Sequence, residues 1–100
     1  MNIQELRDLD GLKRWELLYE DVYLVLLSEQ APLPWRSELL AFDASTLHLR
    51  WRLAPKGDPS NDRIQGVWIR DGKLWAASWS CFTYELERST GKVLSCVFTK

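Results

Sequence analysis

The sequence predicts an α+β fold, in which a short N-terminal helix precedes a curved antiparallel β-meander of six or seven strands. Three observations support this: an Asp71-Gly72 dipeptide between two apolar runs, strict alternation over Leu47–Leu53, and apolar residues at helical spacing near the N-terminus. Such a meander forms a curved sheet or a small open barrel. With 100 residues, 46% of them hydrophobic, the chain is expected to fold as a single domain, residues 1–100.

The N-terminal segment is predicted to be a helix from Asn2 to Leu9. Its apolar residues Ile3, Leu6 and Leu9 recur at a helical interval, and Asn2 can serve as the N-cap. Gly11 can end the helix, because glycine readily takes the left-handed conformation found there.

The next segment favours a hairpin of Arg14–Tyr19 and Val22–Ser28 that turns at Glu20-Asp21. Six consecutive apolar residues from Val22 are too many for a surface helix and are typical of a buried strand. The alternative is a helix over Leu12–Tyr19, where apolar residues also recur at roughly helical spacing.

Two proline-containing connectors flank a second predicted hairpin. Residues 28–36 contain Pro32 and Pro34, which remove backbone donors and favour extended geometry. Strands are then expected at Glu38–Phe42 and Leu47–Leu53, with Leu47, Leu49, Trp51 and Leu53 on one face of the second strand. Ala54–Asp62 has two prolines, a glycine and no large apolar residue, which predicts a loop.

The central hairpin is predicted over Ile64–Trp79, because Asp-Gly supplies the two positive φ angles of a type I′ turn. The expected cross-strand pairs are Arg70 with Lys73, Ile69 with Leu74, Trp68 with Trp75, Val67 with Ala76, Gly66 with Ala77 and Ile64 with Trp79. Alternation then places Ile64, Trp68, Trp75 and Trp79 on one face, and Val67, Ile69, Leu74 and Ala76 on the other. Both faces are apolar, so each is either covered or used for binding.

After this hairpin the alternation changes phase between Trp79 and Phe82, which indicates a bulge or sharp bend at Ser78–Cys81. A last hairpin is expected to pair Phe82–Glu87 with Lys92–Phe98 around Arg88–Gly91.

Composition narrows the classes of partner. A net charge of −1 lacks the basic field that attracts nucleic acid, so no nucleic-acid partner is expected. No apolar run reaches the roughly 18 residues of a membrane span, and the N-terminus lacks the pattern of a secretory signal. The sequence therefore predicts a cytoplasmic protein with Cys81 and Cys96 reduced, no disulfide and no membrane contact.

One strand carries a possible anion-binding ladder. His48, Arg50 and Arg52 alternate on one predicted face, and guanidinium groups at this spacing suit carboxylate or phosphate recognition. The alternative is a solvated strand face paired with acids such as Glu38 or Glu85. Trp35 lies in a connector, so it either folds back as a plug or stands exposed as an anchor for a partner.

The six tryptophans offer a second candidate surface. Trp68 and Trp75, together with Trp79, could form an aromatic platform for a sugar or planar ligand, with Gly66 and Ala77 leaving a notch beside them. The competing interpretation is that these rings fill the core. No catalytic signature, metal-ligand spacing or cofactor motif is present, so the sequence predicts a protein that is neither an enzyme nor a holder of metal or cofactor.

The C-terminal quarter, LWAASWSCFTYELERSTGKVLSCVFTK, resembles the ends of small uncharacterised bacterial proteins, some of immunity type and others of mobile-cassette character. This resemblance implies a small bacterial interaction protein and transfers no site residues.

The function expected from the sequence is a non-enzymatic protein–protein interaction protein of immunity or adaptor type. The predicted edge strands contain no proline to protect them, and both faces of the central hairpin are apolar. Together these features suggest a protein partner, most simply a second copy in a homodimer. The alternative is a small-ligand binding module that uses the tryptophan face.

Overall fold

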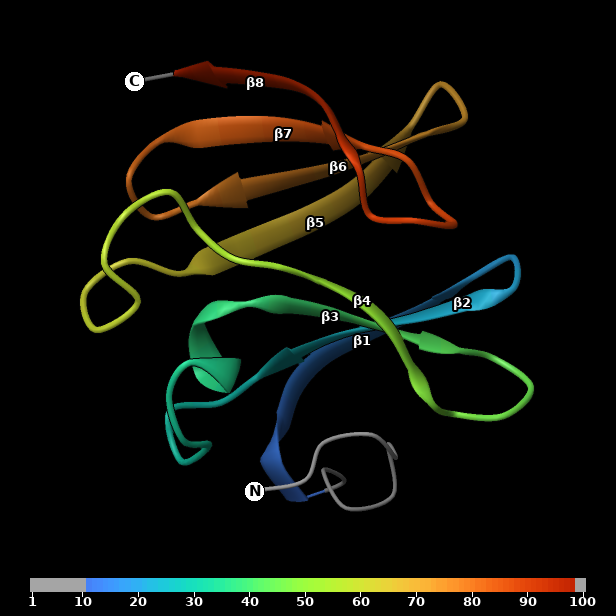
Figure 1. Cartoon of the computed structure of the whole chain (residues 1–100), viewed down its shortest axis with the longest axis horizontal. Coiled ribbons are helices and arrows are strands. Elements are labelled where there is room, and N and C mark those ends of the chain that lie inside the picture. Colours follow the sequence, from blue (N-terminus) through green and yellow to red (C-terminus); the bar gives the residue numbers. More distant parts are fainter. Residues whose placement is uncertain (1–10, 99–100) are drawn as a thin grey trace.

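The fold consists of two four-stranded antiparallel sheets (Figure 1). We analysed a computed structural model, which describes residues 11–98. Sheet I has the order β1-β2-β3-β4 and sheet II the order β5-β6-β7-β8. The strands are β1 (Lys13–Tyr19), β2 (Val22–Leu27), β3 (Leu39–Asp43), β4 (Leu49–Leu53), β5 (Ile64–Arg70), β6 (Lys73–Ser78), β7 (Phe82–Leu86) and β8 (Val93–Phe98).

The predicted α+β meander of six or seven strands is therefore wrong. Within residues 11–98 the chain forms eight strands and short 3-10 turns such as η2 (Trp35–Ser37), and none of its helical turns is long enough to cross a membrane. The predicted helix at residues 2–9 lies outside the described residues. The eighth strand arises because the chain reverses at residues 79–81, where the sequence predicted only a bulge or bend.

One curved sheet does not form because β4 and β5 do not pair. The loop of residues 54–63 joins them, and its two prolines cannot donate to a strand ladder. The second meander therefore packs against the first, and each sheet consists of strands consecutive in sequence.

The first hairpin is confirmed, and the alternative helix over residues 12–19 is wrong. Glu20 adopts the left-handed conformation (φ 54°) in the turn, and Leu17 pairs with Leu24 across the two strands. Alternation in β1 turns Trp15, Leu17 and Tyr19 inward, while the side chains between them are exposed. Period-two burial of this kind is the signature of a strand with one covered face.

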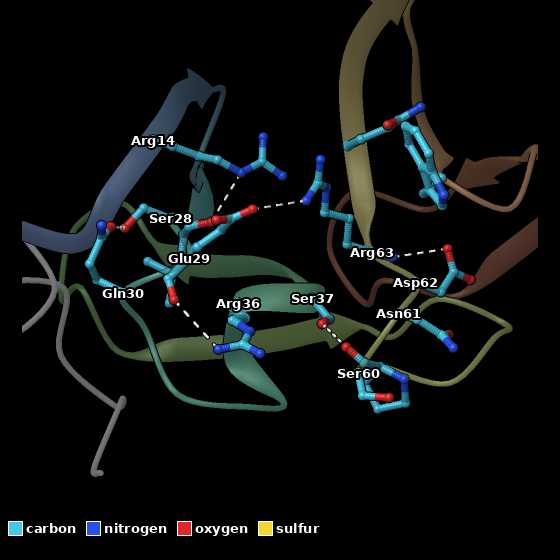
Figure 2. A pocket seen from close by; sticks show the side chains of 14 residues that line it. Arg14, Ser28, Glu29, Gln30, Arg36, Ser37, Ser60, Asn61, Asp62 and Arg63 are labelled. Carbon is cyan, nitrogen blue, oxygen red and sulfur yellow. Dashed lines mark hydrogen bonds and ion pairs between the residues drawn. The ribbon is translucent and has the colours of Figure 1, made fainter.

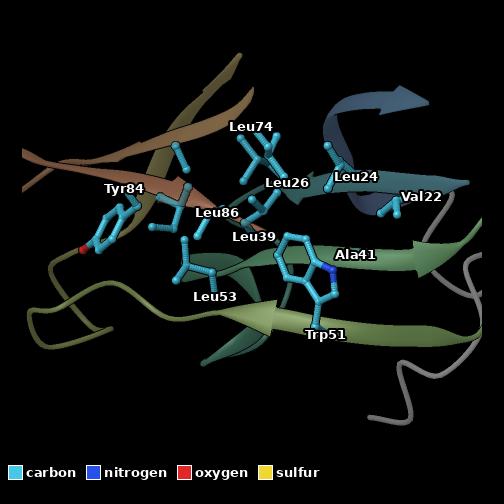
Figure 3. Packing of buried hydrophobic residues seen from close by; sticks show 12 residues of the cluster. Val22, Leu24, Leu26, Leu39, Ala41, Trp51, Leu53, Leu74, Tyr84 and Leu86 are labelled. Carbon is cyan, nitrogen blue, oxygen red and sulfur yellow. The ribbon is translucent and has the colours of Figure 1, made fainter. Parts of the chain in front are cut away.

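The main core lies between the two sheets (Figure 3). Both sheets contribute large aliphatic side chains whose burial supplies most of the favourable free energy of folding. The buried residues are Val22, Leu24, Leu26, Leu39, Ala41, Trp51 and Leu53 from sheet I, and Ile64, Leu74, Ala76, Tyr84 and Leu86 from sheet II.

Sheet I also buries its outer face. The second cluster contains Val25, Leu27, Ala31, Leu40 and Phe42, all of them at most 1% exposed. Both faces of β2 and β3 are thus apolar, which explains the unbroken apolar run that begins at Val22.

The prediction that Leu47, Leu49, Trp51 and Leu53 share one face of a strand is wrong, because β4 contains a bulge. Trp51 pairs with Ala41 and Leu49 with Phe42, so Arg50 is the extra residue between them. Because one inserted residue reverses the alternation, Leu49 packs into the outer cluster while Trp51 and Leu53 face the inter-sheet core.

The central hairpin is confirmed with one correction. Asp71 and Gly72 have φ angles of 54° and 73°, as a type I′ turn requires, and Trp68 pairs with Trp75. Ile64 pairs with Ser78 and not with Trp79, because a bulge at Gln65 shifts the register. Ile64 therefore lies in the core on the opposite face from the tryptophans.

Candidate functional site

The sheets leave a cleft of about 980 Å³ between them at one end (Figure 2). Four segments line it: the start of β1, the connector after β2, the loop between β4 and β5 with the first residues of β5, and the residue that follows β6. Charged and amide side chains dominate this lining. The cleft is therefore suited to a polar ligand and not to a purely apolar one.

Arg14 is fixed across the two sheets. Its Nε donates to the carbonyl of Leu27 (3.0 Å) in sheet I, and its Nη2 donates to the carbonyl of Ile64 (2.8 Å) in sheet II. Burial lowers the pKa of Arg14, the charge of Arg63 lowers it further, and the charge of Glu29 offsets part of the change. Because both acceptors are neutral carbonyls, these hydrogen bonds hold the guanidinium in place without neutralising its charge, and Glu29 compensates only part of it.

Two further guanidinium groups face the cleft. Arg63 Nη1 lies 3.4 Å from Glu29 Oε1, while Arg36 Nη1 donates to the backbone carbonyl of Glu29 (3.5 Å). The Glu29 side chain is 85% exposed, so its pair with Arg63 is strongly solvated. Glu29 is thus the only carboxylate of the described cleft lining that pairs with an arginine.

Asp62 is the other carboxylate in the lining, and its oxygens are occupied. Burial alone raises the pKa of Asp62, but hydrogen bonds from the Ser80 hydroxyl and from the amides of Gly57, Ser80 and Arg63 outweigh this and lower it. Asp62 therefore ties the β4–β5 loop to the β6–β7 turn. Within residues 11–98, no three His, Cys, Asp or Glu side chains form a group that could hold a metal ion.

Trp79 stands at the edge of the cleft. Its backbone amide donates to the carbonyl of Arg63 (2.8 Å), its side chain is 62% exposed, and the Arg63 guanidinium carbon lies 5.8 Å from the ring centroid. Of the site residues predicted from sequence, Trp79 alone lines the cleft.

A second candidate surface is the edge strand β8. Four of its six side chains are large, apolar and at least 39% exposed: Val93, Leu94, Val97 and Phe98. Phe98 makes an edge-to-face contact with Phe82 of β7, with ring centroids 5.4 Å apart. Cys96 packs toward the inter-sheet core, and neither it nor Cys81 is in a disulfide.

The outer face of sheet II adjoins this edge. Trp68 is 37% exposed and Trp75 is half-buried, with its Nε1 lacking a hydrogen-bond partner among the described residues. A row of smaller residues runs beside these rings from Gly66 through Ala77 and Thr83 to Val97. The tryptophan face is thus partly accessible and does not belong to the core.

Of the two alternatives for Trp35, a plug or an exposed anchor, the structure shows the plug. Its ring packs against the outer cluster, and the Arg52 guanidinium carbon lies 4.2 Å above the ring centroid. Arg52 also pairs with the buried Glu38, with Nε 2.6 Å from Oε1. Burial raises the pKa of Glu38, and Arg52 offsets part of this rise.

The predicted ladder of His48, Arg50 and Arg52 does not exist. The bulge at Arg50 separates it from Arg52, and Arg50 binds Asp21 (3.1 Å) and the carbonyl of Ser89 (3.3 Å). His48 is exposed and lies apart from the cleft.

Sequence reasoning missed Arg14, Arg36 and Arg63. They lie in three separate segments, and no local motif marks them. Only the packing of sheet II against sheet I brings them to one cleft.

Comparison with known proteins adds a family but no activity. No curated protein matches the chain. Residues 15–98 match the family described as a domain of unknown function (DUF7957), a span that contains seven strands entirely and most of β1. The chain therefore belongs to this family.

Proposed function

We propose that the protein is a non-enzymatic interaction protein of immunity or adaptor type, which binds by adding its β8 edge to a strand of another chain. The observation that carries the proposal is the composition of β8. It ends sheet II, exposes four large apolar side chains and contains neither charge nor proline. Such an edge presents backbone donors and acceptors that a second strand can pair with.

The other three edges of the two sheets support this choice by contrast. Edge strand β1 carries Lys13, Arg14 and Glu16, β4 carries Arg50 and Arg52, and β5 ends with Arg70. Charges on an edge oppose pairing with other chains, because the pairing would desolvate them. β8 is the uncharged edge among the described strands.

The partner that we propose is a second copy of the same chain. Two β8 strands can pair antiparallel about a two-fold axis, which makes the same patch on each subunit self-complementary. A net charge of −1 per chain opposes this association only weakly. The exposed Val97 and Phe98 would be covered by the second subunit.

Sedimentation equilibrium at micromolar concentration tests this proposal. We expect a mass near twice the 11.7 kDa of one chain for the wild type, and a mass near that of one chain for Val97→Lys. Leu18→Lys is the matched control, because Leu18 is 61% exposed on the charged edge strand β1. If the wild type sediments with the mass of one chain, the proposal of a homodimer is wrong.

Hydrogen exchange then locates the contact. If β8 pairs with another β8, its amides become more protected as protein concentration rises, while those of β1 do not. Protection that does not depend on concentration contradicts strand addition.

A second candidate function uses the outer face of sheet II for a sugar or planar ligand. The observation that favours it is the partly exposed pair of Trp68 and Trp75 beside the small residues Gly66 and Ala77. Trp68→Leu should then abolish ligand binding without changing the sedimented mass. If edge pairing is the only function, the wild type itself should bind no sugar or planar ligand.

A further inference from the structure

The cleft between the sheets carries more positive charge than its own carboxylates neutralise. Arg14, Arg36 and Arg63 line it, and within residues 11–98 two of these three guanidinium groups, those of Arg14 and Arg36, bind only neutral carbonyl oxygens. The carboxylate of Asp62 is occupied by amides and a hydroxyl. An anion that entered the cleft would therefore meet charge that the fold leaves uncompensated.

The cost of holding this charge is visible in Arg14. Partial burial of its side chain and the neighbouring Arg63 both lower the pKa of Arg14, and the charge of Glu29 offsets only part of this, so the surroundings disfavour the charged form. A bound anion would reverse this, because an opposite charge nearby favours the charged form.

Arg14 is also prepared for binding. Two hydrogen bonds to opposite sheets, 3.0 Å and 2.8 Å long, fix its guanidinium before any ligand arrives. A ligand then loses less free energy in ordering this side chain than it would with a mobile one.

The exposed indole of Trp79 adds a flat apolar surface at the edge of the cleft. Aromatic rings bind planar groups by stacking. The volume of about 980 Å³ is sufficient for a ligand that spans both the arginines and this ring.

We propose that this cleft binds an organic oxyanion, with a phosphate or carboxylate group among Arg14, Arg36 and Arg63 and a planar group against Trp79. The oxyanion takes the place of Glu29 as the partner of Arg63. That exchange costs little, because the Glu29 pair is long at 3.4 Å and exposed.

Isothermal titration calorimetry with four probes tests the proposal. The probes are adenosine 5′-monophosphate, adenosine, benzoate and inorganic phosphate. Binding of the monophosphate but not of adenosine supports the proposal with phosphate as the charged group, and binding of benzoate supports it with carboxylate. If none of the anions binds, the proposal is wrong.

Charge variants give changes of opposite sign. Arg36→Gln should weaken binding about tenfold, because it removes a charge-assisted hydrogen bond. Glu29→Gln should tighten binding about threefold, because it removes the competing carboxylate of an exposed pair. Arg70→Gln is the matched control. Arg70 is an exposed arginine at the end of β5, whose first residues line the cleft, but Arg70 itself lies outside the cleft. Equal affinity in Arg36→Gln and Arg70→Gln would overturn the proposal.

Tryptophan fluorescence tests the planar group. The monophosphate should change the emission of the wild type, and Trp79→Leu should lose this change and bind it no better than inorganic phosphate. An unaltered signal in Trp79→Leu would overturn the stacking part of the proposal. These measurements do not depend on β8, so their failure is distinguishable from failure of the proposed homodimer.

Discussion

The two ends of the molecule use arginine differently. At the end that carries the β1–β2 turn, here named the closed end, Arg50 and Arg88 pair with Glu20 and Asp21. The indole of Trp51 donates there to the carbonyl of Arg88 (2.7 Å). At the open end, the cleft keeps a volume of about 980 Å³ beside Arg14, Arg36 and Arg63. Both ends join sheet I to sheet II.

The two ends differ in whether each arginine has a carboxylate partner and in whether side chains fill the space between the sheets. Each arginine of the closed end has a carboxylate partner, and Gly91 packs directly on the ring of Trp51. At the open end the acceptors are mostly backbone carbonyls. A cluster of arginines is thus a candidate site only where the fold leaves it uncompensated and accessible, which is why Arg50 and Arg52 were misleading.

The largest expected effect comes from filling the closed end. Gly91→Ala should destabilise the protein by about 3 kcal/mol or more, because a Cβ there would lie under 3.0 Å from three atoms of Trp51 and φ is +74°. Gly72→Ala is the control, with φ +73° and no atom within 4 Å, and should cost about 1 kcal/mol. Urea denaturation measures both. Equal losses would show that the contact with Trp51 adds nothing.

A smaller effect separates the arginines themselves. Arg88→Gln should cost about 1 kcal/mol, because it removes pairs to Glu20 and Asp21 that join the sheets and are screened by solvent. Arg63→Gln should leave the free energy of unfolding unchanged or raise it slightly at low salt, since it relieves repulsion on Arg14. Raising the salt concentration from about 20 mM to about 500 mM shortens the Debye length about fivefold, and this should shrink the difference between the two variants. A larger loss in Arg63→Gln would contradict the contrast between the ends.

The smallest effect is confined to acid. Hydrogen bonds from the hydroxyl and amide of Ser89 and from Thr90 lower the pKa of Glu87 from 4.5 to about 2. Its contribution to stability is therefore complete above pH 4.5 and is lost as the pH falls toward 2. Urea midpoints of the wild type should fall over this window, and Glu87→Gln should show a shallower fall. Parallel curves would exclude Glu87 as a source of acid sensitivity.

Local turn chemistry was predictable from the sequence. The Asp71-Gly72 turn, and with it the pairing of Trp68 with Trp75, follows from the tolerance of aspartate and glycine for positive φ. The Glu20-Asp21 turn was predicted from the apolar runs on either side of it. The bulges at Arg50 and Gln65 were not predicted, because large apolar residues keep the same parity on both sides of each, although the inserted residue reverses which face they occupy. That reversal moved Ile64 into the core and left the tryptophans outside.

The candidate site was less predictable than the strands. Trp79 was a candidate only as part of the predicted tryptophan face, whereas Arg14, Arg36 and Arg63 have no spacing that relates them. Their proximity depends on how two separate sheets stack. Sequence periodicity describes single strands and contains no information about that packing.

The order of the strands has a consequence for how the protein is made. Because every ladder joins neighbours in sequence, sheet I can form on the ribosome while the later strands are still being synthesised. The inward side chains of sheet I, such as Leu24, Leu26 and Leu39, then stay exposed to solvent. They are buried only when Leu74 and Leu86 of sheet II have left the ribosome and pack on them. We therefore expect the nascent chain to be most prone to aggregation in the interval after sheet I has emerged and before sheet II can pack on it.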